Sequence, residues 1–407
     1  MTDRPAPPAM TDHPTGRTPD DPPVSPVTEG GPVSAMTEDA VAVIVPNYNK
    51  AKTLRACLDA IYAQTHPPTD VIVVDDQSTD HSPTITHDYP CTLITQPVNA
   101  GPAAARNTGA RHTTAPLLFF VDSDTAPHPD AIANALHTLH TTPGTGMVQG
   151  IYHPHPLYDD GPVEAYRVAF EHFWRKRSVG RDTGALFAAT LIPRAVFEET
   201  GGFDERLRDG EDDEFGTRLP TRYRLVATDT VVTRHDDVDR LGPMLREQYT
   251  RARTKPALMA RTWRRQRGGA TGARVGMMSP DRFRHLEWAA QLSLAASAGM
   301  ALTVPLTPLV PWLPLTWPAF GLAVVAANHR FLRFAYRLRG PGFALFAAGL
   351  HVLAHLTLVA GLVAGLPRAG YALLRDRDRP ATIGSGPSTA ASGAARPGGP
   401  AGTGGPG

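Results

Sequence analysis

The chain has 407 residues and a formal net charge of +1, from 40 Lys and Arg against 39 Asp and Glu. This balance gives no indication of a nucleic-acid partner, which a strongly basic domain would suggest. The two cysteines, Cys57 and Cys91, are too few for a disulfide scaffold and lack the spacing of a metal site. The length suffices for one large domain or two ordinary ones.

Both ends of the chain are poor in large apolar residues. Residues 1–40 are rich in Pro, Thr and Asp, and the tail at 380–407 consists mostly of Gly, Pro, Ser and Ala. Such segments cannot bury enough apolar surface to offset the entropy lost on ordering, so we predict that both are disordered. The first forty residues also lack the apolar run of a secretory signal peptide.

Between residues 41 and 240, strand patterns alternate with helical patterns. The predicted strands are 41–46, 70–76, 91–96 and 117–122, and the predicted helices are 53–64, 101–112 and 129–140. The strands are apolar throughout, which is typical of a mainly parallel sheet covered by helices on both faces. We therefore expect an α/β domain whose ligands bind at the carboxyl ends of the strands.

Polar side chains follow each of the four strands. In chain order they are Tyr48 and Asn49, then Asp75 and Asp76, then Asn99, Gly101 and Arg106, then Asp122 and Asp124. Each group alone has an ordinary explanation, such as the capping of a helix N-terminus. Together they suit a nucleotide diphosphate, because carboxylates can bond a base and a ribose, arginine can bind diphosphate oxygens, and paired aspartates can hold Mg²⁺ or Mn²⁺. Such an ion would stabilise a leaving diphosphate.

Six segments, in this order, resemble the motifs of family 2 inverting glycosyltransferases. They are "VAVIVPNYNKAKTLRACLDAI", "VIVVDDQSTD", "NAGPAAARNTGA", "FFVDSD", "GGFDERL" and "GEDDEFGTRL". The resemblance covers roughly residues 41–240. It implies the A-type glycosyltransferase fold, in which a nucleotide-sugar-binding half precedes an acceptor-binding half.

The resemblance also implies roles for individual residues. The donor-binding residues would be Pro46, Tyr48, Asn49, Asp75, Asp76, Asn99, Gly101, Arg106 and Asp122. Asp76 would bond the base with support from Asp75. Asp124 would be the direct metal ligand, with Asp122 shared between ribose and metal. His235 is a candidate third metal ligand, although a lone histidine is more often structural.

The resemblance places the remaining chemistry in residues 201–219. Asp212, the second acid of the Glu211–Asp212 pair, would be the base that takes the acceptor's proton. Asp213 follows directly and leaves a one-residue ambiguity, and a solvated acidic patch at a helix N-terminus is the alternative. The acceptor-side loop would be Gly201, Gly202, Phe203 and Asp204. Arg218 would face either the diphosphate or the solvent.

The chain departs from the family pattern at three places. Gln77 stands where relatives commonly have glycine, which affects the turn under the base. Small apolar residues predominate in "TGALFAATLIPRAVFEET", where a polar contact to donor or acceptor is expected, so neither substrate is defined. The chain has no Q-x-x-R-W motif after the acidic pair, which argues against a processive polymer synthase.

The C-terminal region is apolar. Long apolar stretches at 286–304, 309–327 and 343–366 predict two or three transmembrane helices within residues 286–367, and buried core helices are the alternative. A basic juxtamembrane segment at 241–285 precedes them. It carries eleven basic and two acidic residues between Arg246 and Arg284, which predicts a cytoplasmic catalytic domain at residues 41–240. Basic clusters on both sides of the third stretch leave the number of crossings open.

Together these features predict a multi-pass cell-membrane glycosyltransferase with a bound Mg²⁺ or Mn²⁺. It would transfer a sugar from a nucleotide-sugar donor, linked to UDP or GDP, to a hydroxyl of a lipid-linked or cell-envelope acceptor. A catalytically silent membrane scaffold on a transferase-like domain is one alternative. A nucleotidyltransferase is another, but "PNYNKAKT" has no glycine for a triphosphate loop.

Overall fold

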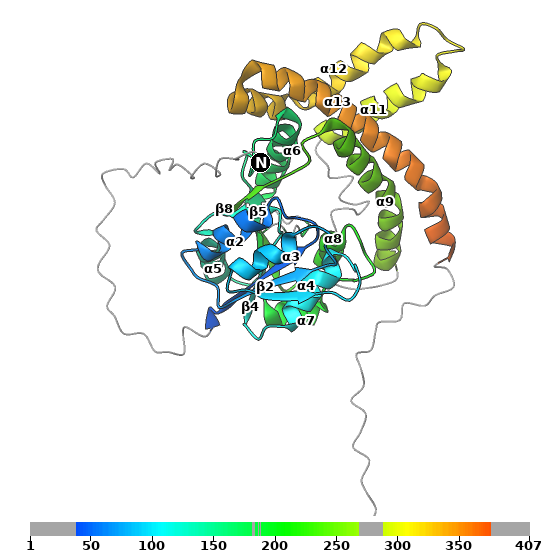
Figure 1. Cartoon of the computed structure of the whole chain (residues 1–407). Helices are drawn as coiled ribbons and strands as arrows, with labels where there is room; N and C mark the ends of the chain where they lie inside the picture. Colours follow the sequence, from blue (N-terminus) through cyan, green and yellow to red (C-terminus); the bar gives the residue numbers. More distant parts are fainter. Residues whose placement is uncertain (1–37, 181–183, 186, 188, 268–287, 376–407) are drawn as a thin grey trace, which may run out of the picture.

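The structure is a computed structural model that describes residues 38–180, 184–185, 187, 189–267 and 288–375. Figure 1 shows an α/β domain with a group of long helices at one side. The disorder predicted at 380–407, and at 1–40 apart from its last three residues, lies outside the described part of the chain.

Eight strands form one sheet in the order β3-β2-β1-β4-β7-β6-β8-β5. They are β1 (Val41–Asn47), β2 (Asp70–Asp75), β3 (Thr92–Thr95), β4 (Leu117–Val121), β5 (Thr125–Pro127), β6 (Thr145–Tyr152), β7 (Ala189–Pro193) and β8 (Arg224–His235). The four predicted strands are confirmed as β1 to β4, and their pairings with one another are all parallel. However, β7 runs antiparallel to both β4 and β6, and β5 antiparallel to β8. The sheet is therefore mixed. The sequence did not reveal this, because an apolar pattern predicts a strand but not its direction.

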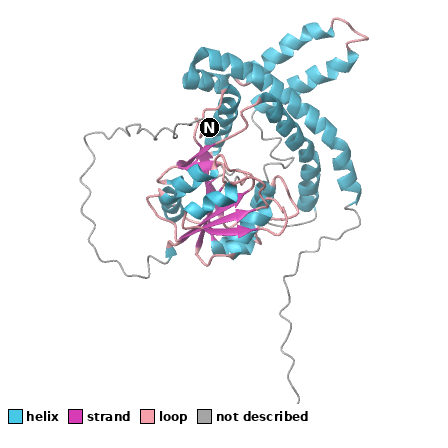
Figure 2. Cartoon of the chain, in the orientation of Figure 1, coloured by secondary structure: helices cyan, strands magenta, loops and turns pink. Residues whose placement is uncertain are grey.

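Helices cover both faces of the sheet. In the α/β domain they are α2 (Leu54–Tyr62), α3 (Ser82–Ile85), α4 (Pro102–Arg111), α5 (Ala131–Thr141), α6 (Pro162–Ser178), α7 (Arg194–Thr200) and α8 (Glu211–Arg218), with the short 3₁₀ helix η1 (Thr86–Asp88). The C-terminal part contains α9 (Leu241–Arg267), α11 (Trp288–Thr303), α12 (Trp317–Ala327) and α13 (His329–Arg375), with 3₁₀ turns η2 (Val304–Leu306) and η3 (Leu313–Thr316). Figure 2 shows the strands gathered in the α/β domain and the long helices beside them.

The central strand β1 contributes to two hydrophobic cores. Its odd-numbered residues, such as Val43, pack into a cluster with α2 and α5, and Ile44 packs into a second cluster with α4, α7 and α8. Helix α4 approaches β1 closely at Gly109, where a Cβ atom would lie 2.4 Å from Ile44 Cγ2. This two-sided burial explains the unbroken apolar run of the strand.

The C-terminal helices pack on the α/β domain through α6. Residues of α13 such as Phe331 and Leu350 share a buried cluster with Val163 and Tyr166 of α6. The Tyr166 hydroxyl and His351 Nδ1 are hydrogen-bonded at 2.7 Å. His351, one of two histidines in the third apolar stretch, therefore faces protein, where it joins α13 to α6.

Helix α13 also lies along α9 (Figure 1), and two glycines permit the close contact. A Cβ atom at Gly361 would lie 2.5 Å from Ala252 Cβ, and one at Gly365 would lie 2.4 Å from the Arg253 carbonyl oxygen. Glycines four residues apart lie on the same face of a helix, which lets two backbones approach. The pair thus fixes α13 against α9 over more than one turn.

One helix in the described part of the chain is long and apolar enough to cross a membrane. It is the segment His329–Tyr371 of α13, with a mean hydropathy of 1.9 for its most apolar window, and it is bent at Gly340, where φ is 85°. As described, α11 has 16 residues and α12 has 11, both fewer than the ~20 that a bilayer requires. Prolines between them break the apolar pattern into short turns, so several crossings are not shown.

Candidate active site

A cleft of about 980 Å³ opens at the carboxyl ends of β1, β2 and β4, where the sequence predicts ligand binding. Of the predicted site residues, nine line it: Pro46, Tyr48, Asp76, Asn99, Gly101, Arg106, Asp122, Asp124 and His235. Those not found among the lining residues are Asn49, Asp75, Gly201, Gly202, Phe203, Asp204, Glu211 and Asp212. The topology of the sheet therefore brings the separate polar groups to one place.

The two acids after β2 bond different parts of the chain. Asp75 is buried and accepts hydrogen bonds from Asn47 Nδ2 at 3.0 Å and from the backbone N–H of Ser78 at 3.1 Å. Asp76 accepts the backbone N–H groups of Ala100 and Gly101, both at 2.7 Å. Asp75 thus holds the β1 and β2 loops together, while Asp76 fixes the start of α4 and still lines the cleft.

Two non-glycine residues in these loops have positive φ angles. Asn49 has a φ of 52°, and its Oδ1 accepts the Thr79 N–H at 2.7 Å, so this side chain ties one loop to the other. Gln77 has a φ of 65°, in the left-handed region that glycine favours. The glycine-like turn of the family pattern is therefore kept at Gln77, at a cost of roughly 1–2 kcal/mol for a residue that carries a Cβ.

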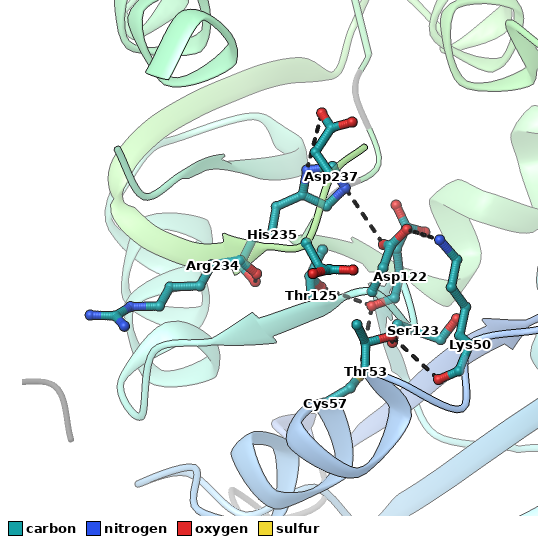
Figure 3. A network of polar contacts seen from close by, with 12 residues as sticks. Lys50, Thr53, Cys57, Asp122, Ser123, Thr125, Arg234, His235 and Asp237 are labelled. Carbon is teal, nitrogen blue, oxygen red and sulfur yellow. Dashed lines mark hydrogen bonds and ion pairs between the residues drawn. The ribbon is translucent and has the colours of Figure 1, made fainter. Parts of the chain in front are cut away.

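Asp122 and Asp124, the two aspartates of the D-x-D loop (residues 122–124), each pair with a cation. Arg106 Nη2 lies 2.7 Å from Asp122 Oδ1, and Lys50 Nζ lies 2.7 Å from Asp124 Oδ2. Figure 3 shows Lys50 and His235 approaching the loop of Asp122 from two sides. These cations offset the mutual repulsion of two carboxylates at the end of a buried strand.

His235 reaches this loop through strand pairing. The antiparallel pairing of β5 with β8 places His235 opposite Thr125, and the Asp236 N–H donates to the Asp124 carbonyl at 2.9 Å. As a result, His235 Nε2 lies 3.8 Å from Asp124 Oδ1. The imidazole also stacks on Tyr152, with ring centroids 4.5 Å apart and an interplanar angle of 8°.

The charges of the loop act on its pKa values in opposite directions. Burial alone would raise the pKa of Asp124, but Lys50 and His235 more than compensate and hold it well below its usual range. For Asp122, burial outweighs the opposing effect of Arg106 and raises the pKa. Asp124 is therefore ionised at neutral pH.

The donor atoms of this loop suit a divalent cation. Carboxylate oxygens with a nearby imidazole are ligands that Mg²⁺ or Mn²⁺ accepts. As the side chains stand, no three His, Cys, Asp or Glu in the described ranges are grouped closely enough to hold a metal ion. Lys50 and Arg106 each bond a carboxylate oxygen that such an ion would use.

The acidic pair opens helix α8 and is connected to the same loop. Arg106 Nη1 lies 2.7 Å from Glu211 Oε1, so one guanidinium bridges Glu211 and Asp122. Glu211 and Asp213 are buried, which rules out a solvated acidic patch. Burial and the neighbouring Glu211 carboxylate raise the pKa of Asp212 to about 7, against the opposing charge of Arg106. Asp212 is only partly buried, unlike the acids on either side of it.

The segment from Gly201 to Asp204 packs against α4. The Phe203 N–H donates to Asn107 Oδ1 at 2.8 Å, and Phe203 itself is buried in the second core. A Cβ atom at Gly202 would lie 2.8 Å from the same Asn107 oxygen. The structure thus gives this segment a packing role.

Arg218 is hydrogen-bonded within the domain. Its Nε donates to both Glu214 oxygens, at 2.9 and 3.0 Å, and its Nη2 donates to the Gly202 carbonyl at 2.7 Å. Its side chain is 29% exposed and is not among the residues that line the cleft. Arg218 joins α8 to the glycine loop because the i,i+4 spacing places Glu214 beside it.

Several lining residues escaped sequence reasoning. They are Lys50, Lys52, Tyr152, Asp160, Arg167, Glu171, Arg175, Arg208, Asp236, Asp237, Glu247 and Arg251, among others. One signal was available, because Arg167, Glu171 and Arg175 are spaced by four residues and share a face of α6. Arg208 had no such signal, and it reaches the cleft through a 2.7 Å hydrogen bond to Asn99 Oδ1.

The fold and the cleft correspond to an A-type glycosyltransferase-like α/β domain, with paired aspartates at the carboxyl edge of the sheet. Residues 42–182 match the domain described as Glycosyl transferase family 2. The chain therefore contains a glycosyl transferase family 2 domain, which the sequence motifs predict and which supports a transferase.

The chain is similar to several curated glycosyltransferases. It is 28% identical over 218 residues to Glycosyltransferase AglE of Haloferax volcanii, a match that covers 51% of this chain and 70% of that protein. It is 29% identical over 188 residues to an uncharacterised glycosyltransferase of Haemophilus influenzae, covering 44% of this chain and 61% of that protein.

Among solved structures, the chain is similar to the mannosyltransferase PcManGT from Pyrobaculum calidifontis, in complex with GDP-Man and Mn²⁺. The TM-score is 0.49 with 23% sequence identity, and the match covers 81% of this chain and 87% of that chain.

Proposed function

We propose that this chain is a membrane-anchored, metal-dependent inverting glycosyltransferase. It transfers one sugar from a nucleotide-diphosphate donor to a hydroxyl of a lipid-linked or cell-envelope acceptor. One observation carries this proposal: a single Arg106 guanidinium joins Asp122 of the D-x-D loop to Glu211, the neighbour of Asp212, at the edge of one large cleft. The groups needed to hold a leaving group and to accept a proton are therefore connected.

The donor's nucleotide occupies the end of the cleft at β1 and β2. Pro46 and Tyr48 form one wall, and Asp76 and Asn99 supply polar atoms for the base and ribose. The base is uracil or guanine, since the site offers acceptors for imide N–H groups. Gly101 lies beneath Arg208, whose Cδ would be 3.0 Å from a Cβ at this position, so the backbone and a cation meet near the diphosphate.

Asp124 and Asp122 would hold a divalent ion, Mg²⁺ or Mn²⁺, with His235 as the third candidate ligand. Such an ion would supply positive charge to stabilise the leaving diphosphate. Lys50, whose Nζ lies 2.7 Å from Asp124 Oδ2, would then be available to the phosphate oxygens.

Asp212 acts as the general base. Its carboxylate takes the proton of the acceptor hydroxyl as that oxygen bonds the anomeric carbon, while the bond between this carbon and the diphosphate oxygen breaks. This single displacement inverts the anomeric centre. A pKa of about 7 suits the role, because a substantial fraction of the group is ionised near neutral pH and still accepts a proton well.

The C-terminal helices anchor the enzyme to the membrane and keep the catalytic domain on the cytoplasmic side. Leu309, Leu315 and Leu345 have exposed fractions of 79%, 80% and 78%, which is unusual for large apolar side chains outside a lipid or protein contact. The long apolar segment of α13 and the basic α9 supply a span and a surface for anionic headgroups. A lipid-linked acceptor follows from this position.

A donor screen with the purified full chain tests the proposal. Release of UDP or GDP from nucleotide sugars should require Mn²⁺ or Mg²⁺, and NMR of the product should show an inverted anomeric centre. Asp212→Asn should retain nucleoside-diphosphate binding but lose transfer. If the folded protein binds a nucleoside diphosphate yet turns over no donor with any lipid-linked or glycan acceptor, the catalytically silent scaffold becomes the better description.

A further inference from the structure

The cleft is lined by one arginine that has two buried nitrogens without a hydrogen-bond partner in the described part of the chain. Arg175, on α6, buries both Nε and Nη1 without a hydrogen bond to any described residue. Its nearest carboxylate oxygen is Glu171 Oε2, 3.5 Å from Nε, in an ion pair without hydrogen-bond geometry. Its side chain is only 11% exposed. A buried guanidinium in this condition is unfavourable unless a ligand accepts its N–H groups.

The other cations of the cleft differ in this respect. The cleft is lined by eight lysine and arginine side chains: Lys50, Lys52, Arg106, Arg167, Arg175, Arg208, Arg240 and Arg251. Seven of these pair with carboxylates at 3.7 Å or less, Arg175 among them at 3.5 Å, and Arg208 donates to Asn99. Among the eight, Arg175 alone has two buried nitrogens without a hydrogen-bond partner in the described part of the chain. Arg106 also has an unpartnered Nε, but its two other nitrogens bond Asp122 and Glu211.

A stack of three side chains holds Arg175 in place. Its Cζ lies 4.1 Å from the centroid of the Tyr152 ring, and His235 stacks on that ring at 4.5 Å. Because two groups cannot occupy one face of a ring, Arg175 and His235 pack on opposite faces of Tyr152. A guanidinium fixed by stacking keeps its N–H edge free for an oxyanion.

The stack lies beside the D-x-D loop. His235, which Figure 3 shows at the end of β8, has its Nε2 3.8 Å from Asp124 Oδ1. Arg175 lines the same cleft as Asp122 and Asp124. An anion that bonded Arg175 would therefore lie in the cleft of the proposed donor site.

We propose that Arg175 is a substrate-binding residue whose guanidinium, clamped on Tyr152, donates hydrogen bonds to phosphate oxygens. This inference rests on the proposed function, since it assumes that a nucleotide sugar enters the cleft. Phosphate oxygens come either from the donor's diphosphate or from a phosphate carried by the acceptor. The planar fork of arginine suits both, and the low exposure of the site strengthens the bonds.

Two binding experiments with the full chain in detergent separate these sources. The first titrates UDP and GDP in the presence of Mn²⁺, without acceptor. The second titrates dodecyl phosphate, a simple long-chain phosphate, with dodecanol as the uncharged reference. Both are run on wild type, Arg175→Met, Arg175→Lys and the control Lys176→Met, whose side chain is 59% exposed and pairs with Asp229 at 3.9 Å.

Loss of charge-assisted hydrogen bonds should weaken the affected ligand by about 10- to 100-fold in Arg175→Met. Arg175→Lys, which keeps the charge but not the planar fork of N–H groups, should lose less affinity. Lys176→Met should bind each ligand with the affinity of the wild type. Weaker UDP or GDP binding assigns Arg175 to the donor diphosphate, and weaker dodecyl phosphate binding assigns it to the acceptor.

Unchanged binding of every probe in both Arg175 variants overturns the inference while the proposed function stands. Should Arg175→Met fail to fold, Arg175→Lys decides the matter through the same titrations. A wild-type protein that binds neither UDP nor GDP contradicts the proposed function itself, and the assignment of Arg175 falls with it.

Discussion

Replacing Lys50 by methionine should increase the affinity of the chain for Mn²⁺ in the absence of nucleotide. In the structure, Lys50 Nζ lies 2.7 Å from Asp124 Oδ2, so a metal ion must displace this ammonium before Asp124 can coordinate it. Methionine has nearly the same length but no charge, which leaves the carboxylate free.

The size of the effect follows from the exposure of the pair. The Lys50 side chain is 39% exposed and that of Asp124 is 19% exposed, so the ion pair is worth about 1 kcal/mol. Recovering this free energy strengthens metal binding about fivefold, and removing the repulsion between an ammonium and Mn²⁺ adds to it in the same direction. We expect roughly a 5- to 10-fold decrease in the Kd for Mn²⁺.

Electron paramagnetic resonance of free Mn²⁺ measures this Kd without any turnover. Lys52→Met is the matched control, since Lys52 lies on the same loop with 37% exposure but pairs with Asp160 and Asp236. Its Kd should change much less. Mn²⁺ binding that is equal or weaker in Lys50→Met would refute the idea that Lys50 competes for Asp124.

Further predictions concern the base, its pKa and the helix contact. Asp212→Asn should lower kcat by about 10²- to 10⁴-fold in steady-state assays while UDP or GDP titrations stay unchanged; a lesser loss would point to another base. Because burial raises the pKa of Asp212 to about 7, kcat should rise from pH 6 to 8. The Asp212 carboxyl keeps its proton in the native state up to about pH 7, whereas in the unfolded state it loses the proton above about pH 4. This difference lowers the free energy of unfolding as the pH rises from 4 to 7. Asp212→Asn should therefore raise the Tm at pH 8 but not at pH 4. Gly361→Ala would place a Cβ atom 2.5 Å from Ala252 Cβ and should destabilise the protein by about 1–3 kcal/mol, measured by thermal unfolding in detergent. The control Gly349→Ala, whose Cβ would meet nothing within 4 Å, should not destabilise it. Equal Tm values for the two variants would contradict the close contact.

The nucleotide half of the domain was the part that sequence patterns could predict. Apolar runs, turn residues and the order of motifs are local, and together they located β1 to β4 and the polar residues at their ends. Gln77 is an exception, because we expected its departure from glycine to affect the turn, yet the residue has a φ of 65°, in the region that glycine favours.

The rest depends on contacts between distant segments. The direction of β7 and the pairing of β5 with β8 cannot be derived from residue patterns, and the second of these places His235 beside Asp124. For the same reason the sequence did not reveal that Arg106 bonds two carboxylates. Composition alone also cannot tell a lipid-facing helix from one that packs on protein, and His351 of α13 does the latter.

The contact between α9 and α13 joins a wall of the cleft to the long apolar C-terminal helix. Pro243, Glu247 and Arg251 of α9 line the cleft. Directly after them, Ala252 and Arg253 of the same helix contact Gly361 and Gly365 of α13. Helix α13 is therefore not an exchangeable module, because an unrelated apolar helix in its place would move a wall of the cleft. The sequence of α13 is then constrained by the shape of the cleft as well as by its own apolar character.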